Sequence, residues 1–329
     1  MAFRPFCLLA SVVGLTGLAG AAPTPPPRLA LPIACEPGRT CEVQNYVDRD
    51  PGPGAKDYRC GSRTYDAHSG LDIRLPDLRA QRTGVDVLAA ADGKVLRVRD
   101  GVADVSVRVA GQAAVKGQEC GNGLVIEHAG GLSTQYCHMA KGSLKVRPGD
   151  LVKTGTPLGR VGLSGNTEYP HLHMTVLRNG VAIDPFAPDS GRGGQCGAGE
   201  DLWRPDARAA LAYKARVVLN AGFTTGAVTM DQIEDGELAK PNRDAALVVY
   251  VRALGLQAGD IQSLTLLDPS GKILAASKPD PLPRAQAQRV LYVGKPSPAG
   301  GWTAGRYRAH YTVSRDGAIV LRKTLEMPL

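Results

Sequence analysis

Short apolar or alternating runs, separated by glycine and Asp/Asn clusters, recur along most of this 329-residue chain. Four of them lie at residues 95–98, 105–109, 124–126 and 172–177. Runs of this length that alternate with a period of two fit strands and are too short for packed helices. We therefore predict an all-β, antiparallel domain of hairpins and meanders over residues 43–190.

The same pattern returns in the last third of the chain, after a glycine-rich stretch. There we predict a helix at 206–217 and strands at 245–251, 261–267, 306–313 and 318–325. The turn sequences Pro269-Ser270-Gly271 and Arg315-Asp316-Gly317 fall where hairpins need them. Evenly spaced strands without a Cys-Trp-Cys signature predict an immunoglobulin-like β-sandwich over residues 218–329. A glycine-rich linker and short helix at 191–217 would join the two parts.

The chain begins like a secretory signal peptide. Arg4 is the only charge before the apolar run 6–19, and a small-residue cleavage site follows at 19–21. We predict removal of residues 1–21 and, from the prolines that follow, a tether over residues 22–42. No other apolar run approaches the roughly 20 residues that span a bilayer, so we expect an exported protein without stable membrane insertion.

Six cysteines remain after Cys7 is removed with the signal peptide. They are Cys35, Cys41, Cys60, Cys120, Cys137 and Cys196. An even number in an exported chain favours disulfides, although six cysteines allow fifteen pairings. The short loop from Cys35 to Cys41 favours a local bridge, and Cys120 and Cys137 flank a predicted hairpin. Cys60 and Cys196 would then pair. A structural zinc site is the alternative, but the sequence contains no CxxC pair.

The charge of the chain is moderately basic and evenly spread. It has 39 Lys and Arg against 31 Asp and Glu, a net charge of +8, which removal of Arg4 lowers by one. No dense basic run is present, so the excess indicates a solvated surface with some attraction to polyanions rather than a nucleic-acid footprint. Anionic cell-wall polymers are consistent partners, but charge alone does not select them.

Four of the six histidines fall in three short motifs. These are His68-Ser69-Gly70-Leu71-Asp72, Tyr136-Cys137-His138 and His171-Leu172-His173. Residues two apart on a strand share a face, so His171 and His173 would present two imidazoles side by side. With a third imidazole and a carboxylate, they supply the donors of a catalytic zinc and leave one position for water. A single strand histidine is usually only a satisfied polar group, and Asp72 alone can close a turn, but three such motifs together favour a shared site.

These motifs resemble the signature of the lysostaphin-like, or LytM-type, zinc metallopeptidases. The resemblance runs from about residue 65 to 185 and includes VLAAADGKV at 87–95 and the closing Asp184-Pro185. No expected position is substituted. The resemblance implies zinc ligation by His68, Asp72 and His173, with His138 and His171 as unligated catalytic histidines. It also implies an antiparallel β fold of the kind called a duplicated hybrid motif.

The function implied by this resemblance is hydrolysis of peptide cross-links in peptidoglycan. One catalytic histidine would accept a proton from water, and the other would stabilise the oxyanion or protonate the leaving amine. The sequence leaves open which does which, and whether Tyr65 is an oxyanion donor or a packed aromatic. We expect a periplasmic enzyme, with secretion beyond the cell as the alternative. His128 and His310 are predicted to be structural.

Two rival functions remain open at this point. One is a catalytically silent protein on the same fold that binds the wall and activates an amidase. The other is a secreted protease that acts on host or competitor proteins. Filled ligand positions argue against the first, and the absence of a long prosegment before the predicted domain argues against the second. The cross-link cut and the oligomeric state do not follow from these residues.

Overall fold

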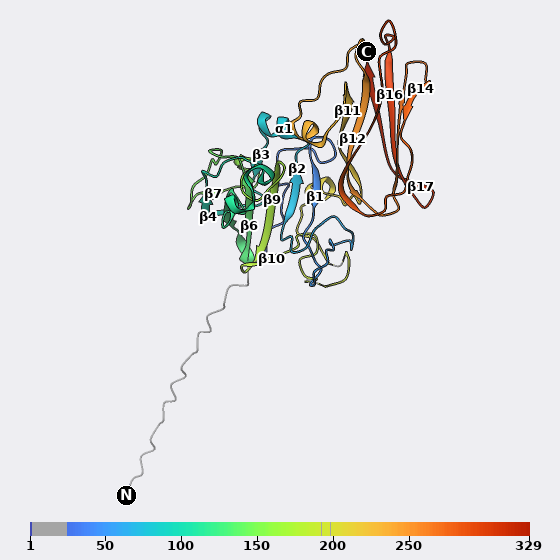
Figure 1. The fold of residues 1–329 in the computed structure, drawn as a ribbon. Helices are drawn as coiled ribbons and strands as arrows, with labels where there is room; N and C mark the ends of the chain where they lie inside the picture. The colour runs from blue at the N-terminus through green and yellow to red at the C-terminus, as the bar shows by residue number, and fades with distance from the viewer. Residues whose placement is uncertain (2–24, 192, 198) are drawn as a thin grey trace.

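The computed structural model describes residues 1, 25–191, 193–197 and 199–329. The predicted signal peptide, apart from Met1, lies outside the described residues. Antiparallel strands dominate and the helices are short, so the all-β prediction is confirmed (Figure 1). In the described chain, no helix is both long enough and apolar enough to cross a membrane.

Eight strands form one large antiparallel sheet. Their order is β1-β2-β9-β6-β5-β4-β7, with β10 paired to β9. Their bounds are β1 (Glu42–Asn45), β2 (Leu71–Arg74), β4 (Gly93–Arg99), β5 (Asn122–Glu127), β6 (Leu132–Met139), β7 (Leu151–Val152), β9 (His171–Arg178) and β10 (Val181–Ile183). A separate pair joins β3 (Asp86–Leu88) to β8 (Pro157–Arg160). The strands predicted at 95–98, 124–126 and 172–177 lie within β4, β5 and β9.

One predicted strand is a helix instead. Residues 105–109 lead into α2 (Val107–Ala110), which a 3-10 turn (Gln112–Val115) follows. The Ser106 hydroxyl accepts a hydrogen bond from the Arg108 amide at 3.3 Å and so caps the helix. Val107 is buried, whereas Val109 is 82% exposed. Local capping therefore outweighs the strand preference of the alternating valines.

Part of the predicted tether is packed against the large sheet. Leu29 and Ile33 are fully buried and join the main core. Leu29 forms a bridge with Trp203, and Ile33 forms one with Val87. Proline holds a chain extended but leaves the amides of the residues between prolines free to pair. Residues 29–33 are therefore packed into the core rather than forming the tether predicted there.

Three disulfides link the six cysteines in the expected pairs. The Cα–Cα distances are 6.0 Å for Cys35–Cys41, 5.5 Å for Cys60–Cys196 and 4.8 Å for Cys120–Cys137. Within the described residues no cysteine remains for a structural zinc site. The last bridge ties the chain before β5 to β6 and lies next to His138.

Two antiparallel sheets build the C-terminal part. One contains β11 (Val217–Thr224), β12 (Leu247–Leu256) and β15 (Gln286–Lys295), and the other contains β14 (Ile273–Ala276), β13 (Ile261–Leu267), β16 (Arg306–Arg315) and β17 (Ala318–Pro328). Both sheets contribute to one buried cluster, for example Val249 from the first and Leu264 and Tyr311 from the second. The four strands predicted here correspond to β12, β13, β16 and β17.

The predicted helix at 206–217 is shorter than expected. It is α3 (Pro205–Ala210), and β11 already begins at Val217. Between them, the Tyr213 hydroxyl donates to Asp57 at 2.9 Å and Lys214 Nζ lies 3.1 Å from Glu42. Because these side chains contact the N-terminal part, residues 213 and 214 do not continue the helix.

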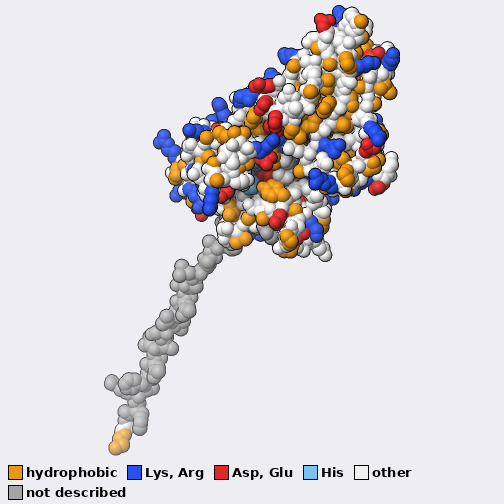
Figure 2. Space-filling view, in the orientation of Figure 1, with side chains coloured by type: hydrophobic (Ala, Val, Ile, Leu, Met, Phe, Trp, Pro, Cys, Tyr) orange, Lys and Arg blue, Asp and Glu red, His pale blue; other side chains and the backbone are white. Residues whose placement is uncertain are grey.

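The C-terminal sheets lie beside the β1–β2 edge of the large sheet (Figure 1). Gln257 Nε2 donates to the Ser62 hydroxyl at 2.6 Å, and Arg63 Nη1 donates to the Lys214 carbonyl at 2.8 Å. Two further short helices, α1 (Leu78–Thr83) and α4 (Met230–Asp235), contact each other at this boundary. On the face shown in Figure 2, basic and acidic side chains are interspersed, as the spread of charge along the sequence predicts.

Candidate metal centre and active-site groove

Neighbouring strands bring the five predicted site residues together. In the order β2-β9-β6, β2 carries Asp72, β9 carries His171 and His173, and β6 carries His138. The register sets Asp72 directly opposite His173. His68 enters from the loop before β2. Because residues two apart share a face, both imidazoles of β9 reach the same cluster.

The donor atoms of His68, Asp72 and His173 lie close together. Asp72 Oδ1 is 3.1 Å from His68 Nε2 and 2.8 Å from His173 Nδ1, and the two nitrogens are 3.2 Å apart. Ligand atoms around a tetrahedral zinc, with bonds of about 2.0–2.1 Å, stand about 3.3 Å apart. This group can hold a metal ion, as can a second group of His138, His171 and His173. Two imidazoles and a carboxylate are a donor set that zinc accepts.

A second layer of hydrogen bonds orients these three side chains. His68 Nδ1 lies 2.7 Å from the Tyr46 carbonyl oxygen, which only accepts, so this nitrogen carries the proton and Nε2 faces the cluster with its lone pair. His173 Nε2 lies 3.1 Å from the Thr175 hydroxyl, which leaves Nδ1 on the inner side. The second oxygen of the carboxylate accepts from Asn45 Nδ2 at 2.8 Å. The donor atoms are therefore preorganised.

The Asp72 carboxylate is buried yet ionised. It is only 2% exposed. Burial by itself would raise its pKa, but the imidazoles of His68 and His171 and the hydrogen bonds that it accepts hold the pKa well below its ordinary value. A buried anion that faces three imidazoles is an environment suited to a divalent cation.

His138 and His171 form the second half of the cluster. Their ring centroids are 4.6 Å apart. His138 Nδ1 donates to the Ser164 carbonyl at 2.8 Å, and His171 Nδ1 lies 3.0 Å from the Tyr169 carbonyl. His171 Nε2 is 3.4 Å from Asp72 Oδ1. Burial, reinforced by the neighbouring imidazoles, holds the pKa of His138 well below its ordinary value, so its Nε2 lone pair is free at neutral pH.

The backbone at His138 is held in an unusual conformation. Its φ is 59°, in the left-handed region that non-glycine residues seldom adopt. The β5–β6 register shifts between Asn122 and Leu124, so that β6 has one extra residue, a bulge, at Cys137 and His138. The His138 amide donates to the Cys120 carbonyl at 2.8 Å, beside the Cys120–Cys137 bridge. A bulge that re-aims one side chain is a common device beside functional sites.

A groove of 380 Å³ opens onto the cluster. Its lining includes Asp72, His138 and His171, together with Gln44, Tyr65, Val107, Gln112, Asn166, Thr167, Glu168, Tyr169, Ala287 and Gln288. Tyr65 is 54% exposed and its ring centroid lies 4.5 Å from that of His68, so it is not a packed core aromatic. Tyr169 precedes His171 by only two residues, so its presence in the groove could have been predicted from the sequence. Gln288 lies more than a hundred residues away, and no local pattern marks it.

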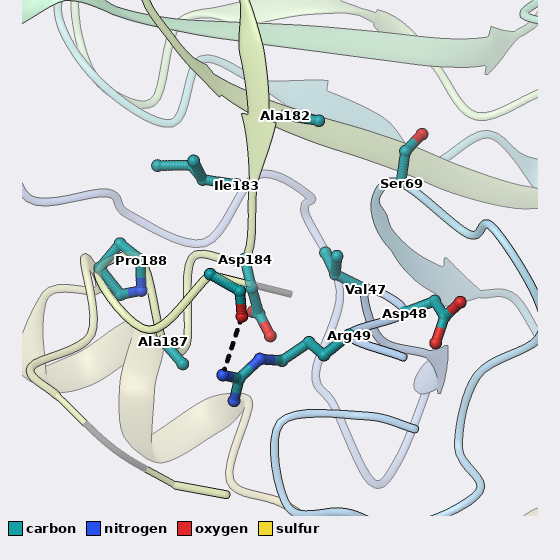
Figure 3. A pocket seen from close by; sticks show the side chains of 10 residues that line it. Val47, Asp48, Arg49, Ser69, Ala182, Ile183, Asp184, Ala187 and Pro188 are labelled. Carbon is teal, nitrogen blue, oxygen red and sulfur yellow. Dashed lines mark hydrogen bonds between the residues drawn. The ribbon is translucent and has the colours of Figure 1, made fainter. Parts of the chain in front are cut away.

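A smaller cavity of 70 Å³ lies beside the loop that carries Ser69 (Figure 3). Its lining includes Arg49, Ser69, Ile183 and Asp184 but no imidazole. The Arg49 guanidinium donates to the Gly191 carbonyl at 3.2 Å. Arg49 also donates to the Ser190 hydroxyl and the Gln195 carbonyl. These contacts hold the loop after β10, and the cavity contributes no group to the metal centre.

The remaining two described histidines lie apart from the cluster, as expected for structural residues. His128 Nδ1 lies 2.8 Å from the Asp92 carbonyl, and its Nε2 lies 2.8 Å from the Thr134 hydroxyl. Both ring nitrogens are therefore satisfied within the fold. His310 sits on β16, exposed, with Thr324 as its neighbour at 3.4 Å.

Comparison with known proteins places the similarity on the part of the chain that carries the cluster. Residues 66–185 match the sequence model of Peptidase family M23. The peptidoglycan DD-endopeptidase ShyB of Vibrio cholerae is 33% identical over 122 residues, 37% of this chain and 23% of the relative. The DD-carboxypeptidase/endopeptidase Mpg of Neisseria meningitidis is 32% identical over 126 residues, 38% of this chain and 23% of the relative. The chain thus spans about a quarter of the length of these relatives.

A zinc-containing peptidase from Vibrio cholerae is 27% identical, and the match covers 45% of this chain and 39% of that one with a TM-score of 0.28.

Proposed function

We propose that residues 66–185, which match the sequence model of Peptidase family M23, form a LytM-type peptidase domain, and that the chain is a zinc metalloendopeptidase that hydrolyses peptide cross-links in bacterial peptidoglycan. The observation that carries the proposal is the convergence of three metal-binding donors, 2.8–3.2 Å apart, beside two further imidazoles. The relatives, which include peptidoglycan DD-endopeptidases, support this substrate class.

In this proposal His68, Asp72 and His173 hold the zinc. Their fit rests on the donor spacing and on the ionised state of the buried carboxylate. Asn45 and Tyr46 keep the carboxylate and the His68 ring in place. Zinc bound there supplies Lewis acidity for the scissile carbonyl and lowers the pKa of a bound water towards about 7.

His138 and His171 are the proposed catalytic histidines. The carbonyl groups of Ser164 and Tyr169 fix their Nδ1 atoms, so their Nε2 atoms face the reacting groups. One accepts the proton of the attacking water, and the other stabilises the oxyanion or protonates the leaving amine. The neutral state of His138 suits the acceptor role. Tyr65 is exposed and lines the groove, which supports a role for its hydroxyl as a further oxyanion donor.

We propose the wider organisation on the same basis. Residues 1–21 are an export signal, 43–190 the peptidase domain with its duplicated hybrid motif, 191–217 the linker, and 218–329 an immunoglobulin-like sandwich. Two antiparallel sheets around one core support the last assignment. Three disulfides support an oxidising location, which for this substrate is the periplasm.

Metal content and cell-wall digestion test the proposal together. The mature protein should bind one zinc, and His173→Ala should lose both zinc and activity. His138→Ala and His171→Ala should keep zinc while kcat falls by about 10² or more, because each removes a proton-transfer or oxyanion group. Fragments released from purified sacculi would be identified by mass spectrometry. Equal zinc in the wild type and His173→Ala would contradict the ligand assignment.

The same assay separates the enzyme from its rival. A catalytically silent activator would bind sacculi and stimulate an amidase while releasing no fragments of its own. That outcome would replace the enzyme hypothesis, as would wild-type rates in both His138→Ala and His171→Ala.

A further inference from the structure

The groove above the metal centre is not built by the peptidase domain alone. Gln288 and Ala287, from β15 of the C-terminal part, line it together with Asp72, His138 and His171. β15 is an edge strand, paired only with β12 among the described strands. Gln288 is half-buried and Ala287 is exposed. The C-terminal part therefore supplies one wall of the candidate active site.

Arg74 fixes the orientation of the Gln288 amide. Arg74 Nη1 lies 3.1 Å from Gln288 Oε1, and a guanidinium only donates, so the oxygen of the amide must face it. Arg74 is itself fully buried and held on several sides. It donates to Gln44 at 2.7 Å, pairs with Glu234 at 2.5 Å and lies 3.7 Å over the Tyr169 ring.

This orientation directs the amide nitrogen of Gln288 away from Arg74. No hydrogen bond within the described chain uses Gln288 Nε2, so its two N–H donors remain available. Other groove groups, such as Gln112 and Asn166, are also neutral amides, and Glu168 adds a negative charge at the rim. A neutral donor beside a carboxylate suits a neutral carbonyl oxygen better than an anionic ligand.

We propose that Gln288 is a substrate-binding residue whose Nε2 donates a hydrogen bond to a backbone carbonyl oxygen of the peptide in the groove. Arg74 is the positioning residue that holds the amide in the donating orientation. The inference rests on the proposed peptidase function and assigns the C-terminal part a direct contribution to substrate binding. It predicts that the affinity for the peptide depends on a hydrogen-bond donor at position 288 and not only on the size of the side chain.

Three variants of the full mature chain test this. Gln288→Glu keeps the length and the contact to Arg74 but replaces the donor with an acceptor. Gln288→Ala removes the group. Gln286→Ala is the matched control, since Gln286 lies on the same strand, two residues before, and does not line the groove. Rates would be measured on a soluble cross-linked muropeptide, with zinc content and thermal stability for each variant.

We expect kcat/KM to fall about three- to tenfold in Gln288→Ala, the effect of one neutral hydrogen bond, mainly through KM. Gln288→Glu should lose at least as much while it keeps wild-type zinc content and stability. Gln286→Ala should stay within about twofold. A merely structural Gln288 would give the opposite ranking, with Gln288→Glu unimpaired and Gln288→Ala unstable, and that result would overturn the proposal.

A binding measurement separates this inference from the proposed function. The dissociation constant of the same muropeptide would be measured by calorimetry for the zinc-free wild type and Gln288→Glu. If the wild type cleaves nothing but Gln288→Glu binds about tenfold more weakly, the peptidase proposal fails and the Gln288 contact stands. If the wild type cleaves and Gln288→Glu binds equally well, the contact fails and the peptidase proposal stands. If the wild type cleaves nothing and neither zinc-free protein binds the muropeptide, both proposals fail.

Discussion

Gly70 leaves the space that the His173 imidazole occupies. A Cβ at this position would lie 2.6 Å from His173 Nε2 and 2.8 Å from the Met174 carbonyl oxygen. The backbone of β9 cannot move aside without shifting both of its histidines, so the ring would be displaced from Asp72. We predict that Gly70→Ala lowers zinc affinity by at least about tenfold and the free energy of unfolding by about 1–3 kcal/mol. Zinc titration and urea denaturation measure the two effects.

Ser69→Ala is the control for this prediction, because it changes the neighbouring residue without adding an atom beside β9. It should leave zinc affinity near the wild-type value. If Gly70→Ala binds zinc with wild-type affinity, metal binding does not require the present spacing between the His173 imidazole and Asp72.

Asp184 predicts a pH dependence of stability outside the metal centre. Its carboxylate is buried, and Oδ1 accepts from the Phe186 amide at 2.9 Å, but Oδ2 has no hydrogen-bond partner in the described part of the chain. Burial raises the pKa of Asp184 from 3.8 to about 6. The folded state therefore binds this proton more tightly than the unfolded state does. The associated stability is present below about pH 4 and is lost as the pH rises through about 6.

Asp184→Asn should remove this dependence. Relative to the wild type, the variant should gain up to about 2–3 kcal/mol in unfolding free energy between about pH 4 and pH 7. Urea denaturation at several pH values measures the difference. Asp189→Asn, an exposed carboxylate paired with Arg178 at 2.7 Å, should change stability by less than about 1 kcal/mol at each pH. Parallel profiles for the wild type and Asp184→Asn would contradict the assignment.

At the scale of elements, the bridge beside the β6 bulge supports His138. Cys120 and Cys137 are 17 residues apart in sequence, and a loop of this length predicts about 3 kcal/mol of stabilisation. Replacing both by serine should cost about that much and lower kcat, because the bulge that aims His138 loses its anchor. Zinc content should persist, since β2, β9 and the loop before β2 carry the proposed ligands. Denaturation and steady-state kinetics measure both effects.

The Cys35–Cys41 pair provides the matched control. It closes a loop of only 6 residues, so its removal should cost about 2 kcal/mol. We expect no change in kcat, because the pair precedes β1, which lies three strands away from β6 in the large sheet. Equal losses of kcat in both double variants would indicate a general loss of folding rather than a local effect on the bulge.

The elements that sequence reasoning predicted well are those whose signal is local. β9 follows from the alternating run after His171, and its period places two imidazoles on one face. Residues 107–110 form α2 instead of the predicted strand because Ser106 caps a helix there. The helix α3 is shorter than predicted because Tyr213 contacts the distant residue Asp57. Gln288 joined the groove only through the packing of two sheets. Tertiary contacts of this kind have no periodicity that one sequence can reveal.

At the scale of the whole molecule, one carboxylate joins the two halves. Arg74 on β2 and Arg252 on β12 are both fully buried, and both pair with Glu234 of α4. Arg252 also donates to the Pro76 carbonyl and to Asn220. Two buried guanidinium groups that share one anion depend on it strongly, because each would otherwise be an uncompensated buried charge.

Glu234→Gln should therefore lower the free energy of unfolding by about 3–5 kcal/mol, the usual effect of removing one partner from a buried ion pair. Glu237→Gln is the matched control: Glu237 is 3.3 Å from Arg82 in an exposed pair at the same boundary, and its loss should cost less than about 1 kcal/mol. Because Arg74 also lies over Tyr169 and holds Gln288, Glu234→Gln should raise KM, whereas Glu237→Gln should not. Urea denaturation and kinetics on a cross-linked muropeptide measure both. If the two variants had equal stability and equal KM, the N-terminal and C-terminal parts would fold and act independently. The contacts of Arg74 would then not couple the C-terminal sheets to the groove.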